Sequence, residues 1–263
     1  MQGLVPRIKS YGRLFRFRYH LNFISVIAGV LFASGSLSAA LAGRVAMLYV
    51  SFNVLLYGGL YALNEVTDLP SDRSHPTKSR RPVASGEITV GSALVFAAVS
   101  LASGLLTSRF FFGADVFRLF PAFILVNVLY SVAARKVPYL ELAVNASTHP
   151  LRFALGASLV GGKVPALFLA AYFFCFLGFV CVRRVVEMDV EGWQSRQASR
   201  RYSRRGLLAV QAGAFAMLAG LAAIDRVTPG IWYAVTAGFY AGGVFGIYVF
   251  APIRRLYRAS FTR

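Results

Sequence analysis

Charged residues and cysteine are scarce in this sequence of 263 residues, and both shortages restrict what the protein can be. Only 14% of the residues are charged and 57% are hydrophobic, with a mean hydropathy of +0.61. A soluble domain usually has about 25% charged residues, and a disordered chain has fewer apolar ones. The two cysteines fall within one apolar run and form neither a disulfide pattern nor a zinc pattern. The composition excludes a disordered chain and favours a polytopic membrane protein.

Glycine-rich phosphate-binding loops are also missing, because the sequence contains neither a Walker loop nor a dinucleotide fingerprint. The net charge of +18 would by itself suit a nucleic-acid-binding protein. Here, however, the basic residues lie between long apolar runs, which is typical of membrane topology. We therefore expect no nucleic-acid partner, and the sequence predicts no particular oligomeric state.

Apolar runs long enough to cross a bilayer recur along the whole chain, since a spanning helix needs about 20 apolar residues. The sequence predicts eight spans, at residues 20–41, 45–66, 88–107, 117–134, 142–161, 164–186, 207–224 and 231–251. We expect an all-α transmembrane bundle forming one domain over residues 1–263, with short basic ends at 1–19 and 252–263. Lysine and arginine concentrate in alternate connections, which places both ends and the two longest connections on the cytoplasmic side.

Only ten acids occur, and most of them gather at the inner ends of two predicted spans. The two acidic clusters are Glu65, Asp68 and Asp72, and then Glu187, Asp189 and Glu191. Neighbouring carboxylates repel unless a cation lies between them, and Mg²⁺ typically binds one or two carboxylates together with phosphate oxygens. The alternative is a solvated helix end whose charges stabilise the helix. Asn64, Asp68 and Asp72 are spaced by four residues, so they share one face if the helix continues to Asp72.

Basic residues follow the first acidic cluster directly. Lys78, Arg80 and Arg81 lie within eighteen residues of Asn64, in a segment that three prolines keep from forming a long helix. Such side chains donate hydrogen bonds to phosphate oxygens. Cytoplasmic loops are basic for topological reasons as well. Acids for a metal beside bases for phosphate nevertheless predict a metal–diphosphate site.

The predicted span 142–161 contains polar residues at helical spacing. They are Glu141, Asn145, His149 and Arg152. Because a charge at mid-membrane costs about 2.5–3.5 kcal/mol on insertion scales, this stripe indicates an anion-lined interior cavity, or else a structural polar seam. Other candidate substrate-binding residues near span ends are Tyr130, Lys136, Arg183 and Arg184. An anion transporter would also use such a stripe, but the two halves of the chain show no convincing internal repeat.

Residues 64–86 combine these features in one pattern. They read Asn64-x-x-x-Asp68-x-x-x-Asp72, followed by His75-Pro76-x-Lys78-x-x-Arg81-Pro82-x-Ala84-Ser85-Gly86. This pattern resembles the first signature of the UbiA superfamily of intramembrane prenyltransferases. The resemblance implies a helical bundle around a central cavity, usually with nine helices where we count eight spans. It also implies two acidic motifs that hold Mg²⁺ and a diphosphate at the cytoplasmic end.

The resemblance assigns expected roles to individual residues. Asp68 and Asp72, with Glu187 or Glu191, are expected to bind Mg²⁺, and Asn64 to orient one ligand. The predicted catalytic residues are thus Asn64, Asp68, Asp72 and Glu187. Lys78, Arg80 and Arg81 are expected to bind phosphate oxygens, and Tyr57 and Tyr61 to line the cavity for an isoprenoid. The second motif reads Glu187-x-x-x-Glu191 where ordinary prenyltransferases have two aspartates.

Three further stretches are similar to the decaprenyl-phosphate phosphoribosyltransferase branch of this superfamily. They are residues 72–78, residues 130–157, and Arg183-Arg184-x-x-Glu187 followed by Arg200 and Tyr202. Glu65 and Glu141 replace the usual aspartates of that branch, and Arg183 replaces a lysine. The similarity implies transfer of phosphoribose from phosphoribosyl diphosphate to a polyprenyl phosphate, in a bacterial inner membrane. Transfer of a polyprenyl group from its diphosphate to an aromatic or lipid acceptor is the alternative, and an anion transporter is a second one.

Overall fold

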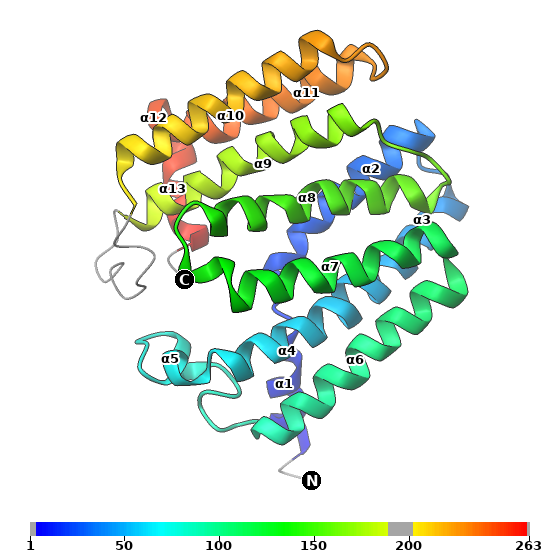
Figure 1. Ribbon diagram of the computed structural model, residues 1–263. Coiled ribbons are helices and arrows are strands. Elements are labelled where there is room, and N and C mark those ends of the chain that lie inside the picture. Colours follow the sequence, from blue (N-terminus) through cyan, green and yellow to red (C-terminus); the bar gives the residue numbers. More distant parts are fainter. Residues whose placement is uncertain (1–3, 189–201, 262–263) are drawn as a thin grey trace. The chain divides into compact units, whose positions relative to one another are not determined.

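The computed structural model describes residues 4–188 and 202–261, and the regular elements in these two stretches are helical (Figure 1). In chain order they are α1 (Leu4–Leu14), η1 (Phe17–Phe23), α2 (Ile24–Ser34), α3 (Ala39–Tyr49), η2 (Val50–Leu56), α4 (Tyr57–Thr67), α5 (Leu69–Arg73), η3 (Lys78–Arg80), α6 (Val90–Phe111), α7 (Ala114–Val132), η4 (Ala134–Lys136), α8 (Leu140–Leu159), α9 (Ala166–Glu187), α10 (Arg204–Ile224), α11 (Gly230–Tyr240), η7 (Ala241–Phe245), α12 (Gly246–Val249) and α13 (Ala251–Phe261). Glu191 of the second acidic motif lies outside the described residues.

Each of the eight predicted spans coincides with a helical stretch. In the described parts of the chain, seven stretches are long and apolar enough to cross a membrane. The remaining prediction, 142–161, matches α8, a helix of 20 residues that contains Glu141, His149 and Arg152. The all-α membrane fold is therefore confirmed. Beyond the last span, α13 has only 11 residues and is too short to cross a bilayer.

The predicted boundary between the first two spans is wrong by several residues. The first span ends at Ser34, because Gly35 takes a left-handed φ of 70° and its N–H bonds to the Leu31 carbonyl. Ser38 then caps α3, its hydroxyl oxygen accepting a hydrogen bond from the Leu41 N–H at 3.2 Å. Glycine and serine interrupt the apolar run too weakly for the hydropathy pattern to locate this turn.

Two compact units make up the chain, and the first contains residues 1–127 and 155–162. Within it α6 lies along α4 and η2, a π-helical stretch (Figure 1). A Cβ on Gly104 of α6 would lie 3.1 Å from the Ser51 carbonyl, so glycine allows the two backbones to approach closely. The Ser51 hydroxyl donates to the Gly104 carbonyl at 3.1 Å across the same contact. The arrangement as one domain stays a prediction.

A second close approach in this unit joins the end of α8 to α2. A Cβ on Gly156 would lie only 1.9 Å from the Val26 carbonyl oxygen, so no other residue fits there without moving a helix. Lipid tails are as apolar as these side chains, and helices in a membrane therefore associate through such tight van der Waals contact. Glycines 104 and 156 thus set the spacing of their helix pairs.

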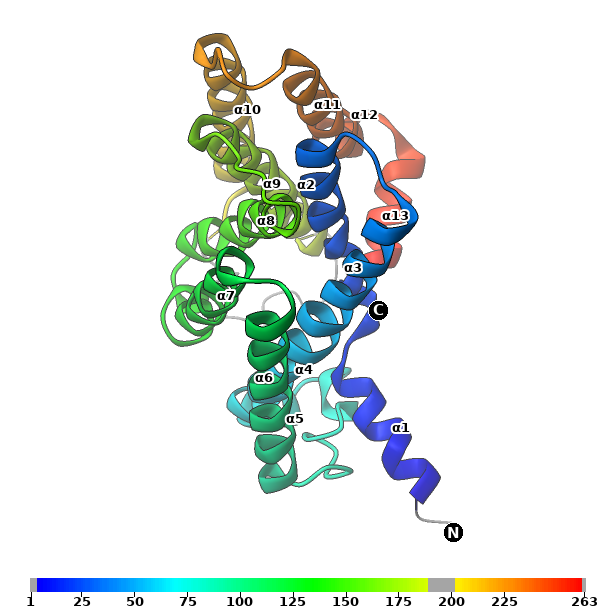
Figure 2. The same cartoon turned by 90° about the vertical axis from the view of Figure 1, so that its right-hand side faces the viewer.

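The second unit contains residues 128–154 and 163–263, and α9 and α10 lie side by side in it (Figures 1 and 2). Gly178 of α9 leaves room for the Tyr240 ring, which a Cβ would approach to 2.3 Å. The Tyr240 hydroxyl donates to the Gln211 carbonyl at 2.6 Å. The buried Gln211 side chain donates to the Gly178 carbonyl at 3.3 Å and accepts from the Tyr248 hydroxyl at 2.7 Å. Its polar atoms are thus satisfied inside the unit, as burial requires.

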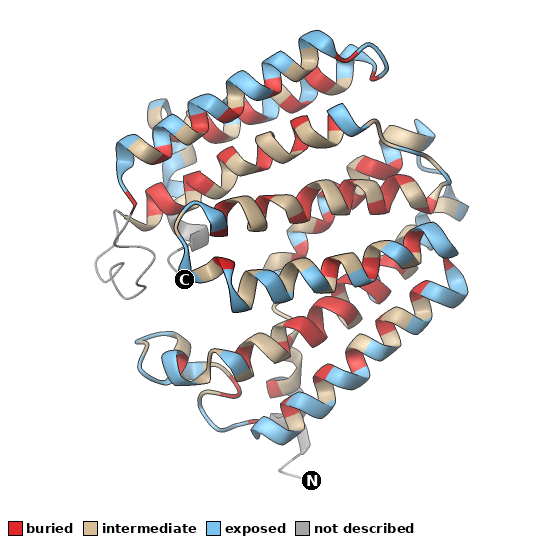
Figure 3. Ribbon diagram, in the orientation of Figure 1, coloured by how far each residue is buried: buried red, intermediate tan, exposed pale blue. Residues whose placement is uncertain are grey.

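Large apolar side chains remain exposed along the outer faces of the long helices (Figure 3). On α6 these include Val95, Val99 and Leu106, and on α7 Leu125. A water-soluble monomer rarely exposes apolar surface on this scale. The surface fits an integral membrane protein, in which lipid covers these side chains.

Candidate functional site

The first acidic motif retains helical spacing through the end of α4. The Asp68 N–H bonds to the Asn64 carbonyl and the Asp72 N–H to the Asp68 carbonyl, each at 2.9 Å. Pro70 does not interrupt this ladder, because it lies in the first turn of α5, where its missing N–H has no helical partner. As the spacing predicts, Asn64, Asp68 and Asp72 follow one another at intervals of one turn.

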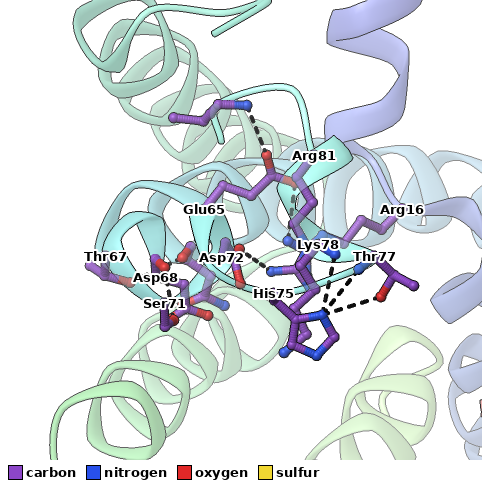
Figure 4. Close-up of polar contacts among 12 residues, drawn as sticks. Arg16, Glu65, Thr67, Asp68, Ser71, Asp72, His75, Thr77, Lys78 and Arg81 are labelled. Atoms are coloured by element: carbon purple, nitrogen blue, oxygen red, sulfur yellow. Dashed lines mark hydrogen bonds and ion pairs between the residues drawn. The ribbon is translucent and has the colours of Figure 1, made fainter. Parts of the chain in front are cut away.

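Asp72 is the most deeply buried acid of this motif, with 1% of its surface exposed. Its Oδ2 accepts a hydrogen bond from the Arg81 guanidinium at 2.5 Å (Figure 4). Its Oδ1 is also buried and accepts no hydrogen bond from any described residue. A buried carboxylate oxygen without a partner is costly, and a bound cation would satisfy it. Asp68 and Asn64 are half-buried beside it in the chain.

The basic residues are ordered by a tight turn after α5. His75 Nδ1 accepts hydrogen bonds from the Thr77 and Lys78 N–H groups at 3.3 and 3.4 Å. The short helix η3 follows, and the Arg81 N–H bonds to the Lys78 carbonyl at 2.9 Å. Lys78 is half-buried, Arg80 is exposed, and the Arg81 side chain turns back to Asp72 (Figure 4). The structure thus brings Arg81 to the first acidic motif, and its predicted role in binding phosphate stays a prediction.

Glu65, the remaining acid of this cluster, has a different environment from Asp72. Its Oε1 pairs with the Arg16 guanidinium at 3.0 Å, and its Oε2 accepts from the Val83 N–H at 3.4 Å. The carboxylate is 2% exposed and its two oxygens are both engaged. The sequence pattern groups Glu65 with the metal-binding acids, but it contains no signal for Arg16, which lies 49 residues away.

The two tyrosines predicted to face an isoprenoid belong to an aromatic cluster. The Tyr57 and Tyr61 ring centroids are 5.3 Å apart. Tyr57 is buried against Phe52 and Phe123, at 5.4 and 5.7 Å. Tyr61 is half-buried, and the Arg16 guanidinium lies over its ring at 5.2 Å. Of the two, Tyr61 is the more accessible to a ligand.

In the second unit, α9 ends in a network of ion pairs around Glu187. Its Oε1 accepts from Arg183 Nε at 2.8 Å, and its Oε2 pairs with Arg184. Arg184 also pairs with the buried Glu141 of α8 at 2.6 Å, and the Tyr202 hydroxyl donates to the same Glu141 oxygen at 2.8 Å. Burial and the Glu141 charge raise the pKa of Tyr202 above its usual range. Both Glu187 oxygens are therefore engaged by arginines that the sequence assigns to substrate.

In the polar stripe on α8, Glu141, His149 and Arg152 are buried. The Arg152 guanidinium donates to the Thr148 hydroxyl at 2.8 Å and to the Thr148 carbonyl at 3.3 Å. The His149 ring stacks on Phe176 with centroids 3.6 Å apart. Asn145 is half-buried on the preceding turn. Before α8, Tyr130 of α7 is half-buried and Lys136 in η4 is exposed.

Among the described residues, no three His, Cys, Asp or Glu side chains gather closely enough to hold a metal ion. The proposed ligand Glu191 is outside those residues. Within the first unit, the orphaned Oδ1 of Asp72 is the observation that fits a metal. The complete ligand set of the sequence analysis stays a prediction.

Comparison with known sequences extends over nearly the whole chain. The profile of the UbiA prenyltransferase family matches residues 22–261. The decaprenyl-phosphate phosphoribosyltransferase of Mycolicibacterium smegmatis is 25% identical over 256 residues, which cover 90% of this chain and 78% of the relative. The decaprenyl-phosphate phosphoribosyltransferase of Mycobacterium tuberculosis is 27% identical over a match that covers 73% of this chain and 66% of the relative. The nodulation protein NoeC of Azorhizobium caulinodans is 28% identical over 49% of this chain, and the match spans only 42% of that protein.

Solved structures share the fold at low sequence identity. A UbiA homolog from Archaeoglobus fulgidus bound to GPP and Mg²⁺ superposes with a TM-score of 0.76 at 19% identity, covering 96% of this chain and 98% of that one. The apo structure of a UbiA homolog from Aeropyrum pernix K1 gives a TM-score of 0.64, also at 19% identity, with 94% and 92% coverage. These likenesses confirm the helical fold.

Proposed function

This chain belongs to the UbiA prenyltransferase family, and from that premise we propose that it transfers phosphoribose from phosphoribosyl diphosphate to a polyprenyl phosphate. Membership makes it an integral membrane transferase. The finer assignment is supported by the likeness to decaprenyl-phosphate phosphoribosyltransferases, one of which aligns over 90% of the chain. The observation that carries the chemistry is the buried Asp72 carboxylate, held against Arg81 and with one oxygen that has no partner among the described residues.

Magnesium is the cofactor that this proposal requires, and Asp68 and Asp72, with Glu187 or Glu191, are the residues that would hold it. The hard carboxylate oxygens fit that ion, and Asp72 Oδ1 has a buried position for it. When bound, Mg²⁺ would neutralise charge that develops on the departing diphosphate. Glu187 already accepts from Arg183 and Arg184, so a metal bound there would share its oxygens with these arginines.

The chain's own groups would bind the diphosphate and exclude water. Lys78, Arg80 and Arg81 would donate to its oxygens, which stabilises the leaving group as the donor carbon becomes cationic. Asn64 would orient one ligand of the acidic motif. Closing such a site to water protects the cationic donor from hydrolysis. The residues proposed to bind the remainder of the two substrates are Tyr57, Tyr61, Tyr130, Lys136, Asn145, His149, Arg152, Arg183 and Arg184.

The supply of cations supports two anionic substrates. Phosphoribosyl transfer brings together a donor diphosphate and an acceptor phosphate, whereas a neutral aromatic acceptor needs fewer cations. Arg183 and Arg184 are already paired with Glu187 and Glu141, so they support this argument less than the sequence alone suggests. Arg152 is buried on α8 and Lys136 is exposed in η4, and we propose that both bind a substrate anion.

Prenyl transfer to an aromatic or lipid acceptor is the second candidate. It is favoured by the fold neighbour that binds GPP and Mg²⁺. Family membership favours either enzyme over an anion transporter. For both enzymes we propose a bacterial inner membrane with the two chain ends and the acidic clusters on the cytoplasmic side, because lysine and arginine concentrate there.

A donor exchange distinguishes the two reactions. Purified protein in lipid nanodiscs is given either phosphoribosyl diphosphate with polyprenyl phosphate or polyprenyl diphosphate with an aromatic acceptor, in each case with Mg²⁺ or with EDTA. We expect a product only from the first pair and only with the metal. Product from the second pair alone would replace the phosphoribosyl assignment by the prenyl one, and an EDTA-resistant rate would contradict the metal role.

A further inference from the structure

The backbone on both sides of Arg81 is held by side chains from elsewhere in the first unit. On one side, the Arg13 guanidinium of α1 donates to the Arg80 carbonyl. On the other side, the Val83 N–H donates to Glu65 of α4 at 3.4 Å. Arg81 lies between these two contacts, and its own side chain reaches Asp72 (Figure 4). The residue that bonds to the acidic motif is thus fixed at two backbone points.

Arg13 and Glu65, which make these two contacts, are each held by a further ion pair. Arg13 donates to both Glu87 oxygens at 2.8 and 2.9 Å, and the Ser10 hydroxyl donates to Glu87 at 2.5 Å. Arg16 pairs with Glu65 at 3.0 Å. Hydrogen bonds from Ser10 and Arg13 hold the pKa of Glu87 below its usual value, so this carboxylate stays charged. The N-terminal segment therefore contacts the loop between α5 and α6 directly through Arg13 and indirectly through Arg16 and Glu65.

Packing and backbone geometry support the same connection. Leu14, at the end of α1, is fully buried in a cluster with Ala62 of α4 and Val83 of the loop. Arg16 has a left-handed φ of 48°, a conformation that costs about 1–2 kcal/mol for a residue with a Cβ. Such a conformation persists when surrounding contacts impose it. Here the contacts are the Glu65 ion pair and the Tyr61 ring.

We propose that Arg13, Arg16, Glu65 and Glu87 form an N-terminal clamp that positions Arg81 for the diphosphate, an inference that rests on the proposed function. These four are positioning residues, because they act through the loop and Arg81 is the group that touches the ligand. Between Arg73 and Val90 the loop contains only the short helix η3 as regular structure. Without the clamp Arg81 would have to be ordered at the expense of binding energy.

The two halves of the clamp should differ in strength. Arg13 and Glu87 are 43% and 39% exposed, and an exposed pair contributes little on its own. Arg16 and Glu65 are 16% and 2% exposed, so their pair is more protected from solvent. Substitution of Glu65 should therefore affect Arg81 more than substitution of Arg13. Glu65→Gln is the sharpest change, because its amide oxygen can still accept from Val83 while the charge is lost.

The test combines two measurements on the full chain in nanodiscs. Titration calorimetry measures affinity for inorganic pyrophosphate with Mg²⁺, and hydrogen exchange measures protection of the backbone in residues 78–88. We expect Glu65→Gln and Arg16→Gln to weaken pyrophosphate binding on the order of tenfold and to speed exchange in this segment. Glu65→Asp should restore both. Arg118→Gln, which removes an exposed pair with Asp115, is the matched control and should change neither.

Unchanged exchange in Glu65→Gln and Arg13→Gln overturns the clamp, and the mild Arg13 change keeps this test available if an Arg16 variant does not fold. Faster exchange with unaltered pyrophosphate affinity overturns its role in positioning Arg81. If the unaltered chain binds no pyrophosphate, the proposed function fails, and the exchange result then decides separately whether the clamp exists.

Discussion

At the scale of single residues, the buried acids Glu65 and Asp72 differ in how many of their carboxylate oxygens have a hydrogen-bond or ion-pair partner. Glu65 engages both of its oxygens with protein donors, whereas Asp72 Oδ1 has no partner in the part of the chain that the structure describes. Both are buried, so burial does not distinguish them, although only Asp72 belongs to the series with four-residue spacing. The difference lies in the donors that surround each carboxylate. Of these two acids, Asp72 is therefore better suited to a cation.

Replacement of Asp72 by asparagine should abolish most of the activity. The side chain keeps its size, but it loses the charge that both Arg81 and a metal require. We expect turnover to fall by about a hundredfold or more, since a metal-bound carboxylate supports several kcal/mol of transition-state stabilisation. Asp115→Asn, at an exposed acid paired with Arg118, is the control for charge removal. Equal rates for the two variants would remove Asp72 from the reaction.

The Glu141–Arg184 pair makes a prediction about stability. Its members are 2% and 5% exposed, and removal of one partner leaves a buried charge unpaired. We expect Arg184→Met to lower the unfolding free energy by about 3 kcal/mol. Adding Glu141→Gln to that variant should recover part of the loss, because the orphaned charge disappears. Thermal unfolding of the single and double variants in detergent measures this, and strictly additive losses would contradict a coupled pair.

At the scale of helices, apolar runs predict where the spans are but not how each one ends or what it packs against. The eight predicted spans match helical stretches because lipid requires every backbone group to be bonded within a helix. The turn at Gly35 and Ser38 escapes this pattern, and so does the π-helical η2 beside Gly104. Both depend on backbone conformation and on neighbouring helices, which hydropathy does not encode.

In the candidate site, too, local structure follows from the sequence pattern while long-range contacts do not. The ladder from Asn64 to Asp72 follows from spacing, since it needs only a local helix. The partners of Glu65 and Glu141 do not, because Arg16 and Arg184 approach from distant segments. A pairing of this kind leaves no periodic signal in one sequence. Local motifs were therefore predictable, while the contacts that hold them were not.

The close contact between α8 and α2 at Gly156 can be tested by substitution. Gly156→Ala would place a methyl group 1.9 Å from the Val26 carbonyl oxygen, so α2 and α8 would have to separate. We expect a loss of about 1–3 kcal/mol in thermal unfolding. Gly213→Ala in α10 faces open space and should instead gain up to about 1 kcal/mol from helix propensity. Similar effects of the two variants would show that the α2–α8 contact is not tight.

At the scale of the whole molecule, acids outside the membrane couple stability to pH. Hydrogen bonds from Thr228, from the Val227 N–H and from Tyr233 hold the pKa of Asp225 at about 2. The pKa of Glu87 is also lowered, by Ser10 and Arg13. A carboxylate with a lowered pKa in the folded state stabilises the protein above its unfolded pKa and loses that contribution in acid. Both acids thus act in the same direction.

Stability should therefore fall as the pH drops from about 5 toward 2, the range between the unfolded and folded pKa values. The melting temperature in detergent, measured across this range, should decline less steeply in Asp225→Asn than in the unaltered chain. The asparagine cannot titrate, so its contribution no longer changes with pH. Parallel curves for the two proteins would mean that Asp225 does not contribute to acid sensitivity.

Arg152 has a consequence for how the protein is made. Its guanidinium bonds to the hydroxyl and the carbonyl of Thr148, one turn earlier in the same helix. A single arginine at mid-membrane raises the free energy of inserting a helix from the translocon by about 2.5–3.5 kcal/mol. Here part of the needed solvation comes from the side chain and the backbone of Thr148, in the same helix. Thr148 therefore reduces the share of that cost that contacts from other helices must offset.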